Sequence, residues 1–223
     1  MSWHSDSLGR WLRSALVLLV VLLHFSVYRL VNDINAVRPP SAFHDFSTSV
    51  DARIPYLDWT WIIYYGALPY TMILGTIVVW RLSSRLSLHA IAAFALMIVA
   101  GGALQLMLTA RSPWPANVWH VQRFFHSISS DPFVCLPSMH VALVTLTAAL
   151  STAVFRSSWV RVIQSAVVVL ISLSTLTLKE HYALDVLAGA FLGAIVYLSW
   201  KHWPLITAGE PQAADLPAQR GSQ

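Results

Sequence analysis

The chain has 223 residues, of which 57% are hydrophobic and only 11% are charged. A water-soluble fold of this size cannot bury so much apolar side chain, so the composition excludes a disordered chain and argues against a soluble globular protein. The formal net charge is +4, but the Arg residues stand beside apolar runs and form no basic stripe, so nucleic-acid binding is not expected. The single Cys135 has no partner for a disulfide or a thiolate metal site within the chain.

Apolar runs long enough to cross a hydrocarbon layer of roughly 30 Å recur along the chain. We expect six transmembrane helices, at about 14–30, 61–80, 90–109, 138–155, 160–178 and 182–200. The first run follows Arg10 and Arg13 in the manner of a signal peptide, but no cleavage site follows it, so we interpret it as a retained span. The sequence therefore predicts an all-α membrane domain over 1–203 and a disordered tail over 204–223.

The short connections between spans predict the orientation of the bundle. Residues 81–89 and 156–159 contain Arg and no acid, which places them, and with them both termini, on the cytoplasmic side. The longer connections 31–58 and 110–137 then face the periplasm or the lumen of an organelle, so the protein belongs to a cell inner membrane or an endomembrane. Long connections over a rigid bundle favour a functional site, although interfacial segments anchored by tryptophan would look the same.

The last span begins with a histidine and an aspartate four residues apart, His181 and Asp185. A carboxylate within a membrane helix is costly and needs a partner, which makes it a candidate functional residue. Residues at i and i+4 lie on one helical face about 5 to 6 Å apart, so Asp185 can accept a hydrogen bond from one imidazole nitrogen of His181. The other nitrogen then remains available for chemistry.

A second histidine is expected at the same depth. Pro137 and Ser138 are typical of a helix start, with the Ser138 hydroxyl as a cap, and they place His140 in the first turn of the span 138–155. The amino-terminal end of a helix favours an anion. The spans 138–155 and 182–200 run in the same direction, so His140 and His181 should meet at the outer face. With Ser138 and Lys179 as expected phosphate-binding residues, the two histidines predict a phosphate site.

The segments Leu136-Pro137-Ser138-Met139-His140 and Lys179 to Gly189 resemble the type 2 phosphatidic acid phosphatase superfamily, and more narrowly its branch containing inositol phosphorylceramide synthases. The six-helix layout and, less specifically, residues 51–55 agree with this resemblance. It implies transfer through a phosphohistidine, without metal or cofactor. His181 would attack phosphorus, Asp185 would orient it, and His140 would protonate the leaving oxygen and then activate the incoming water or alcohol.

The chain departs from the family pattern where cations are expected. In the first motif, Arg111 lies near the expected arginine, but Ser112 follows it in place of proline and Leu104 replaces the lysine. The arginine that precedes the second histidine is missing, and we interpret Lys179 as its substitute. Arg123 is a further candidate for phosphate binding, with contact to lipid head groups as the alternative.

One further departure concerns the acceptor. Met139 replaces the common glycine between Ser138 and His140, which indicates a different acceptor or lipid.

The leading hypothesis is a membrane phosphatase that cleaves the phosphate of a phospholipid, isoprenoid or sphingolipid at the outer leaflet, with the lipid passing sideways between helices. The alternatives are a phosphotransferase that moves a phosphate-containing head group between lipids, and a proton-coupled transporter that uses the His-Asp pair as a relay. A zinc site on His140, His181 and Asp185 is a further reading. The oligomeric state stays open.

Overall fold

The computed structural model describes residues 3–114, 123–124 and 133–207. Within these residues the chain forms six long α-helices and no strand, apart from an isolated bridge between His44 and Ala110. The all-α prediction is therefore confirmed. The helices are α1 (Trp3–Ala36), α2 (Trp61–Arg81), α3 (Ser84–Met107), α5 (Met139–Phe155), α6 (Ser158–Thr177) and α7 (Ala183–Thr207).

Five of these helices are long and apolar enough to cross a membrane, and α5 is the shorter exception. The 17 residues of α5 rise only about 26 Å, and most of its side chains are buried among the other helices. Helix α1 is longer than predicted, at 34 residues, because polar residues at both ends continue the helix beyond the apolar run. Helix α7 continues to Thr207, past the expected end near residue 200, so the first four residues of the tail predicted over 204–223 are helical and not disordered. The rest of that tail, 208–223, lies outside the described residues.

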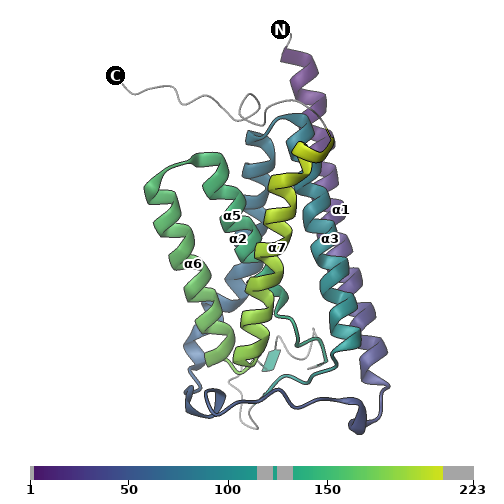
Figure 1. Cartoon of the computed structure of the whole chain (residues 1–223), viewed down its shortest axis with the longest axis vertical. Helices are drawn as coiled ribbons and strands as arrows, with labels where there is room; N and C mark the ends of the chain where they lie inside the picture. Colours follow the sequence, from purple (N-terminus) through teal and green to yellow (C-terminus); the bar gives the residue numbers. More distant parts are fainter. Residues whose placement is uncertain (1–2, 115–122, 125–132, 208–223) are drawn as a thin grey trace.

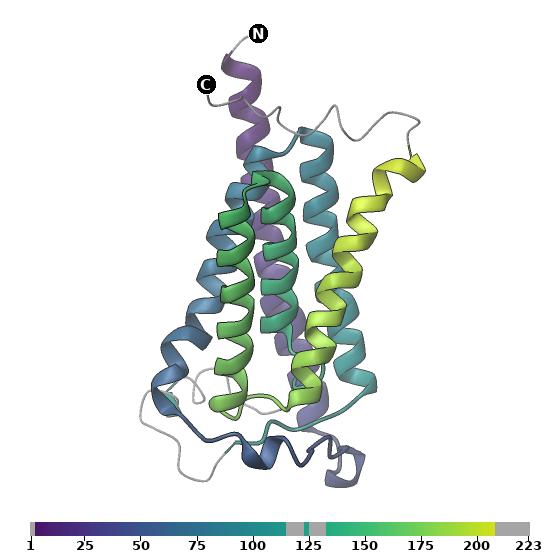
Figure 2. The ribbon, with the colours of Figure 1, turned by 60° about the vertical axis from the view of Figure 1, so that its left-hand side comes forward.

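The first and last helices show which end of the bundle carries the chain termini. The amino-terminal end of α1 and the carboxyl-terminal end of α7 lie at one end of the molecule (Figures 1 and 2), and α5 and α7 begin together at the opposite end. Helix α5 packs most extensively on α7, α6 and α2, whereas α1 packs chiefly on α3. The largest hydrophobic cluster joins α2, α3, α5 and α7 around Met97, Leu146 and Leu150, all fully buried.

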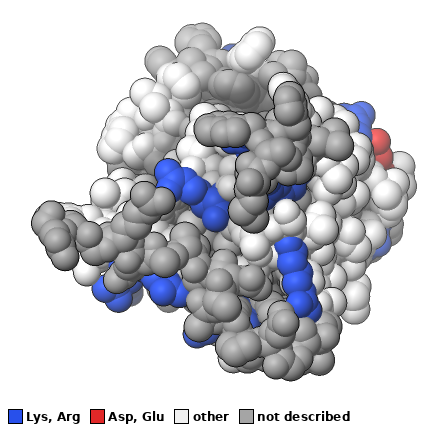
Figure 3. Space-filling model, turned by 90° about the horizontal axis from the view of Figure 1, so that it is seen from above, with Lys and Arg blue, Asp and Glu red and all other residues white. Residues whose placement is uncertain are grey.

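The end that carries the chain termini is basic. Seen from this end, Lys and Arg stand out at several places, while acidic groups appear only at the rim of the view (Figure 3). At this end Arg81 is the last residue of α2, Arg85 lies in the first turn of α3 and Arg156 connects α5 to α6, and no acid occurs in residues 81–89 or 156–159. This distribution agrees with a cytoplasmic assignment for that end, and the sidedness itself stays a prediction.

At the opposite end, the segment 37–60 crosses the bundle through three short 3-10 turns, Pro40–Ala42, Asp51–Arg53 and Asp58–Thr60. Backbone hydrogen bonds attach it to the helix ends: the amide of His44 donates to Thr109, and the amide of Leu57 donates to Thr177, both at 2.9 Å. The segment therefore holds the ends of α3 and α6 together beside the start of α7.

Candidate active site

Two glycines bring α7 against α5. A Cβ added at Gly189 would lie 2.3 Å from the carbonyl oxygen of Ser138, and one at Gly193 would lie 2.6 Å from that of Ala142. Only glycine permits such an approach, which is the small-residue packing typical of membrane helices. The amide of Ser138 also donates to the carbonyl of Asp185 at 3.0 Å. These contacts place the first turns of α5 and α7 side by side.

The structure brings His140 and His181 together across this contact. Their ring centroids lie 6.5 Å apart and the rings are inclined at 61°. Tyr64 of α2 packs on the other side of His140, with ring centroids 4.3 Å apart. The two imidazoles come from residues distant in the sequence but share one wall of a cavity. Two imidazoles that line one cavity are candidates for the nucleophile and the general acid toward a phosphoryl group bound there.

Asp185 lies below His181, fully buried. Its Oδ2 is 3.5 Å from Nδ1 of His181, which is longer than a hydrogen bond. The same oxygen accepts hydrogen bonds from the Tyr182 amide at 2.8 Å and from the Cys135 thiol at 2.7 Å. Cys135 therefore competes with His181 for the carboxylate, a contact that the sequence interpretation missed because 50 residues separate Cys135 from Asp185.

The thiol of Cys135 is buried and protonated in this arrangement. Burial, reinforced by the neighbouring Asp185 carboxylate, raises the pKa of Cys135 well above its usual value. Its Sγ lies 3.6 Å from Nδ1 of His181, so sulfur, nitrogen and the carboxylate oxygen all fall within 4.8 Å of one another. Among the described residues, Cys135, His181 and Asp185 could hold a metal ion. The zinc hypothesis from the sequence had His140 as the third ligand, and Cys135 takes that position here.

Ser138 occupies the N-cap position of α5, but its hydroxyl makes no capping hydrogen bond. The expectation of a side-chain cap is therefore wrong: the hydroxyl is buried and has no hydrogen-bond partner among the described residues. Met139 packs toward Gly101 of α3, where an added Cβ would meet its sulfur. Met139 thus closes the α3 side of the site.

Lys179 lies away from the histidines. Its backbone has a positive φ of 59°, and its ammonium donates to the carbonyls of Asp51 and Ile54 at 3.0 and 2.7 Å. Asp51 in turn accepts a hydrogen bond from the amide of Ala183, the first residue of α7, at 2.7 Å. Lys179 and Asp51 therefore clamp the turn that carries His181 onto the segment 37–60. A phosphate contact by Lys179 stays a prediction that requires it to leave these carbonyls.

The two predicted arginines also lie outside the cavity lining. The guanidinium of Arg111 stacks over the rings of Phe133 and Phe43, 5.0 and 5.8 Å from their centroids. Arg123 is exposed, between two stretches that the structure does not describe. The residue after Arg111, Ser112, does line the cavity.

The cavity beside the histidines has a volume of about 630 Å³. Its walls come from α1, α2, α5 and the segments around 112–114 and 180–181. Two charged residues that the sequence interpretation did not select also line it, Arg29 of α1 and Glu180. Glu180 is buried and accepts a hydrogen bond from the indole of Trp114 at 2.8 Å, and Arg29 pairs with Asp33 at 3.1 Å.

Gln105 holds the backbone that leads to His140. Its side-chain amide donates to the carbonyls of Val134 and Pro137 at 3.1 and 3.0 Å, and Asn35 of α1 donates to Phe133 at 2.8 Å. Both side chains are buried within apolar helices. Gln105, an amide side chain inside the predicted span 90–109, was the available signal, because such a group is costly there without hydrogen-bonding partners. Asn35 lies beyond the predicted span 14–30, so no such signal was available for it.

Comparison with known proteins identifies a family. A family model described as the PAP2 superfamily matches residues 43–199, well over half of the chain. The match includes both histidine segments and begins after α1. No curated protein matches the chain.

Proposed function

Because the chain belongs to the PAP2 superfamily, whose members are phosphoesterases, we propose that it is an integral membrane phosphatase that hydrolyses a lipid phosphate through a phosphohistidine on His181. The site would face the periplasm or an organelle lumen. The observation that carries the proposal is the convergence of two imidazoles at 6.5 Å, with a buried carboxylate 3.5 Å from one of them.

The first step uses the nitrogen of His181 that faces away from Asp185. With Nδ1 directed toward the carboxylate, Nε2 attacks phosphorus, and a nitrogen–phosphorus bond forms as the bond to the lipid oxygen breaks. His140 gives its proton to that oxygen, so that the lipid leaves as a neutral alcohol. The buried Asp185 stabilises the positive charge that develops on the His181 ring, because an opposite charge in a dry site is weakly screened.

The second step reverses the proton transfer. A water molecule loses a proton to His140 and attacks phosphorus, and the bond to His181 breaks, releasing inorganic phosphate. Both steps place negative charge on the oxygens of the phosphoryl group. The amino-terminal end of α5 and Arg29 in the cavity lining can stabilise this charge. Lys179, Arg111 and Arg123 are the further candidates from the sequence, and each would have to move toward the cavity.

The test is phosphate release from lipid phosphates by the purified protein in detergent. His181→Ala removes the nucleophile and is expected to lower kcat at least about a thousandfold. The matched control is His202→Ala, because His202 is an exposed histidine on the same helix, and it is expected to retain activity. Full activity in His181→Ala, with His202→Ala equally active, would refute the assignment.

Transfer to an alcohol is the second candidate, and the size of the cavity favours it. A volume of about 630 Å³ exceeds what a phosphate and a water molecule require, so a second lipid alcohol has room to approach the phosphohistidine. Offering ceramide or diacylglycerol together with a phospholipid donor separates the two reactions by their products. Formation of a new phospholipid identifies a phosphotransferase, and phosphate release alone identifies a phosphatase.

A further inference from the structure

Three side chains of kinds that bind metal ions meet on the Nδ1 side of the His181 ring, and we call Cys135, His181 and Asp185 the Cys-His-Asp cluster. The Sγ of Cys135 lies 3.6 Å from Nδ1 of His181 and 2.7 Å from Oδ2 of Asp185, and Nδ1 lies 3.5 Å from the same Oδ2. In a tetrahedral zinc site, neighbouring ligand atoms stand about 3.4 to 3.6 Å apart. Two of the three separations therefore already match zinc. The third, now a hydrogen bond, opens by about 0.9 Å when the ion replaces the thiol proton.

The burial and charge of the cluster also favour a divalent cation. Asp185 is fully buried, and its Oδ1 has no hydrogen-bond partner among the described residues. A buried carboxylate requires a counter-charge or hydrogen-bond donors for its oxygens, so Oδ1 is available as a metal ligand. With Cys135 as a thiolate, Asp185 ionised and His181 neutral, a bound Zn²⁺ makes the whole cluster electrically neutral, as a buried site requires.

The donor set and its position favour zinc. Thiolate and imidazole are ligands that zinc prefers, whereas Mg²⁺ and Ca²⁺ are bound almost entirely by oxygen. An ion reaches the cluster from the cavity beside the histidines, because Val134 and His181 line that cavity and Cys135 directly follows Val134. The acidic Glu180 in the same lining attracts cations into the cavity.

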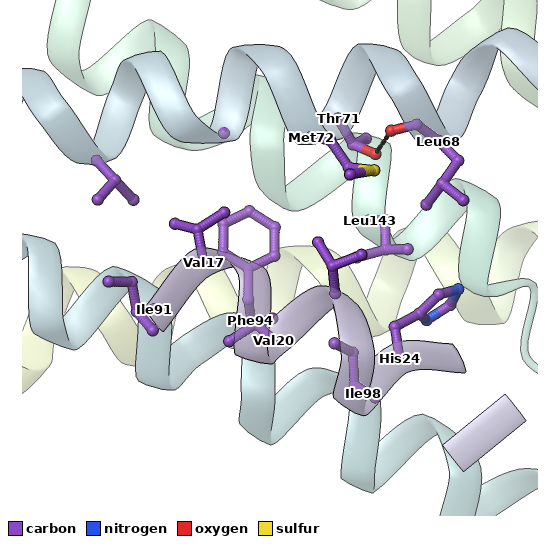
Figure 4. Close-up of a pocket in the computed structure, with 13 residues that line it drawn as sticks. Val17, Val20, His24, Leu68, Thr71, Met72, Ile91, Phe94, Ile98 and Leu143 are labelled. Carbon is purple, nitrogen blue, oxygen red and sulfur yellow. Dashed lines mark hydrogen bonds between the residues drawn. The ribbon is translucent and has the colours of Figure 1, made fainter. Parts of the chain in front are cut away.

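A second pocket of the bundle contains a histidine without such neighbours (Figure 4). This pocket of about 60 Å³ lies between α1, α2 and α3, and His24 lines it together with the apolar side chains of Ile98 and Leu143. The hydroxyl of Thr71, also in its lining, donates to the carbonyl of Leu68 at 2.8 Å. Among the described residues, His24 belongs to no cluster of metal ligands. The variant His24→Ala is therefore the matched control for the loss of a histidine from the cluster.

We propose that the Cys-His-Asp cluster binds one Zn²⁺ ion, and that the bound ion inhibits phosphoryl transfer by His181. On binding, the thiol of Cys135 loses its proton to solvent, and Nδ1 of His181 donates its lone pair to zinc. A neutral imidazole that is bound through Nδ1 carries its proton on Nε2, so Nε2 has no lone pair with which to attack phosphorus. The ion also occupies the Asp185 carboxylate and opposes the positive charge of a phosphorylated ring. The inhibition rests on the proposed function, whereas the binding of zinc does not.

Cobalt substitution tests the binding without turnover. Co²⁺ occupies tetrahedral zinc sites, and a thiolate ligand gives it a charge-transfer band in the near ultraviolet. Cys135 is the only cysteine of the chain, so such a band in the full-length protein, purified without an affinity tag, identifies its ligand. We expect one equivalent of Co²⁺ to produce the band and one equivalent of Zn²⁺ to remove it.

The variants show which side chains hold the cobalt ion. The band is expected to persist in His24→Ala and to be absent in Cys135→Ser. His181→Ala should require at least about a hundredfold more Co²⁺ to produce it, because one of three ligands is lost. No charge-transfer band in the wild type, or an equal affinity for Co²⁺ in His181→Ala, would overturn the site.

Inhibition is measured as phosphate release at zinc concentrations set by a metal buffer, with each variant compared with its own rate in EDTA. The wild type and His24→Ala are expected to be inhibited by zinc and to recover in EDTA. Cys135→Ser should raise the zinc concentration for half-inhibition at least about a hundredfold. Equal zinc sensitivity of Cys135→Ser and the wild type would overturn the inference, as would activity that is lost in EDTA and restored by zinc.

The two measurements separate this inference from the proposed function. A cobalt band in a protein that hydrolyses no lipid phosphate would support the metal site and refute the proposed function. Phosphate release by a protein that gives no cobalt band would refute the metal site and leave the proposed function standing.

Discussion

The contact between Gly189 and Ser138 determines how closely the two histidines approach. In Gly189→Ala the new Cβ would lie 2.3 Å from the Ser138 carbonyl oxygen, and ordinary contact begins near 3.4 Å, so α5 and α7 must separate by about 1 Å. That separation lengthens the hydrogen bond from the Ser138 amide to Asp185 and moves His181 away from His140. A misplacement of this size lowers kcat about a hundredfold, and overpacking costs about 1 to 3 kcal/mol of stability.

The assay compares kcat for phosphate release with the thermal unfolding midpoint in the same detergent. Gly66→Ala is the control, since an added Cβ there meets no heavy atom within 4 Å, and it is expected to preserve both quantities. Wild-type kcat and an unchanged unfolding midpoint in Gly189→Ala would show that the close contact does not set the position of His181, and the reasoning would fail.

Three further predictions follow from single contacts. Gln105→Leu leaves two backbone carbonyls without their donor and is expected to cost about 1 to 3 kcal/mol for each; an unfolding midpoint equal to that of the wild type would contradict this. Partial burial alone would raise the pKa of Asp51, but hydrogen bonds from Thr48 and from the Ala183 amide lower this pKa below its ordinary value of 3.8. The Asp51 carboxylate therefore stabilises the fold above pH 3.8, and this stabilisation is lost as the pH falls through the lowered pKa. In Asp51→Asn, the unfolding midpoint should depend less on pH in the acid range than in the wild type. The same dependence on pH in both proteins would contradict a stabilising contact by Asp51. Cys135, with 1% of its surface exposed and its pKa raised by burial and by Asp185, should resist N-ethylmaleimide at neutral pH in the folded protein and react fully in SDS, as mass spectrometry would show; rapid labelling of the folded protein would contradict its burial.

The features that the sequence predicts are those governed by local pattern. The lengths of the apolar runs placed all six helices, because a membrane span requires a fixed number of apolar residues. The spacing of His181 and Asp185 predicted that they share one helix face. Their contact nevertheless measures 3.5 Å, because Cys135 donates to the same carboxylate oxygen, and periodicity does not reveal which distant side chain reaches a buried acid.

The positively charged side chains show most clearly that the local sequence does not predict which residues reach the cavity. Lys179 stands two residues before His181, yet its positive φ turns the side chain toward the carbonyls of the segment 37–60. Arg29 lies in an apolar helix that the sequence interpretation treated only as a span, and it reaches the cavity lining because α1 packs beside α3. Proximity along the chain was a poor guide to proximity in the site, since tertiary packing decides which side of each helix faces the cavity.

The central claim is that His181 carries the phosphoryl group, and trapping the intermediate tests it most directly. His140→Ala removes the base that activates water, so rapid quenching of this variant with a radiolabelled lipid phosphate that has a good leaving group should accumulate phosphoenzyme. Peptide mapping under alkaline conditions, in which phosphohistidine survives, is expected to place the label on His181. Label on another residue, or turnover without any covalent phosphoenzyme on the millisecond scale, would contradict the account.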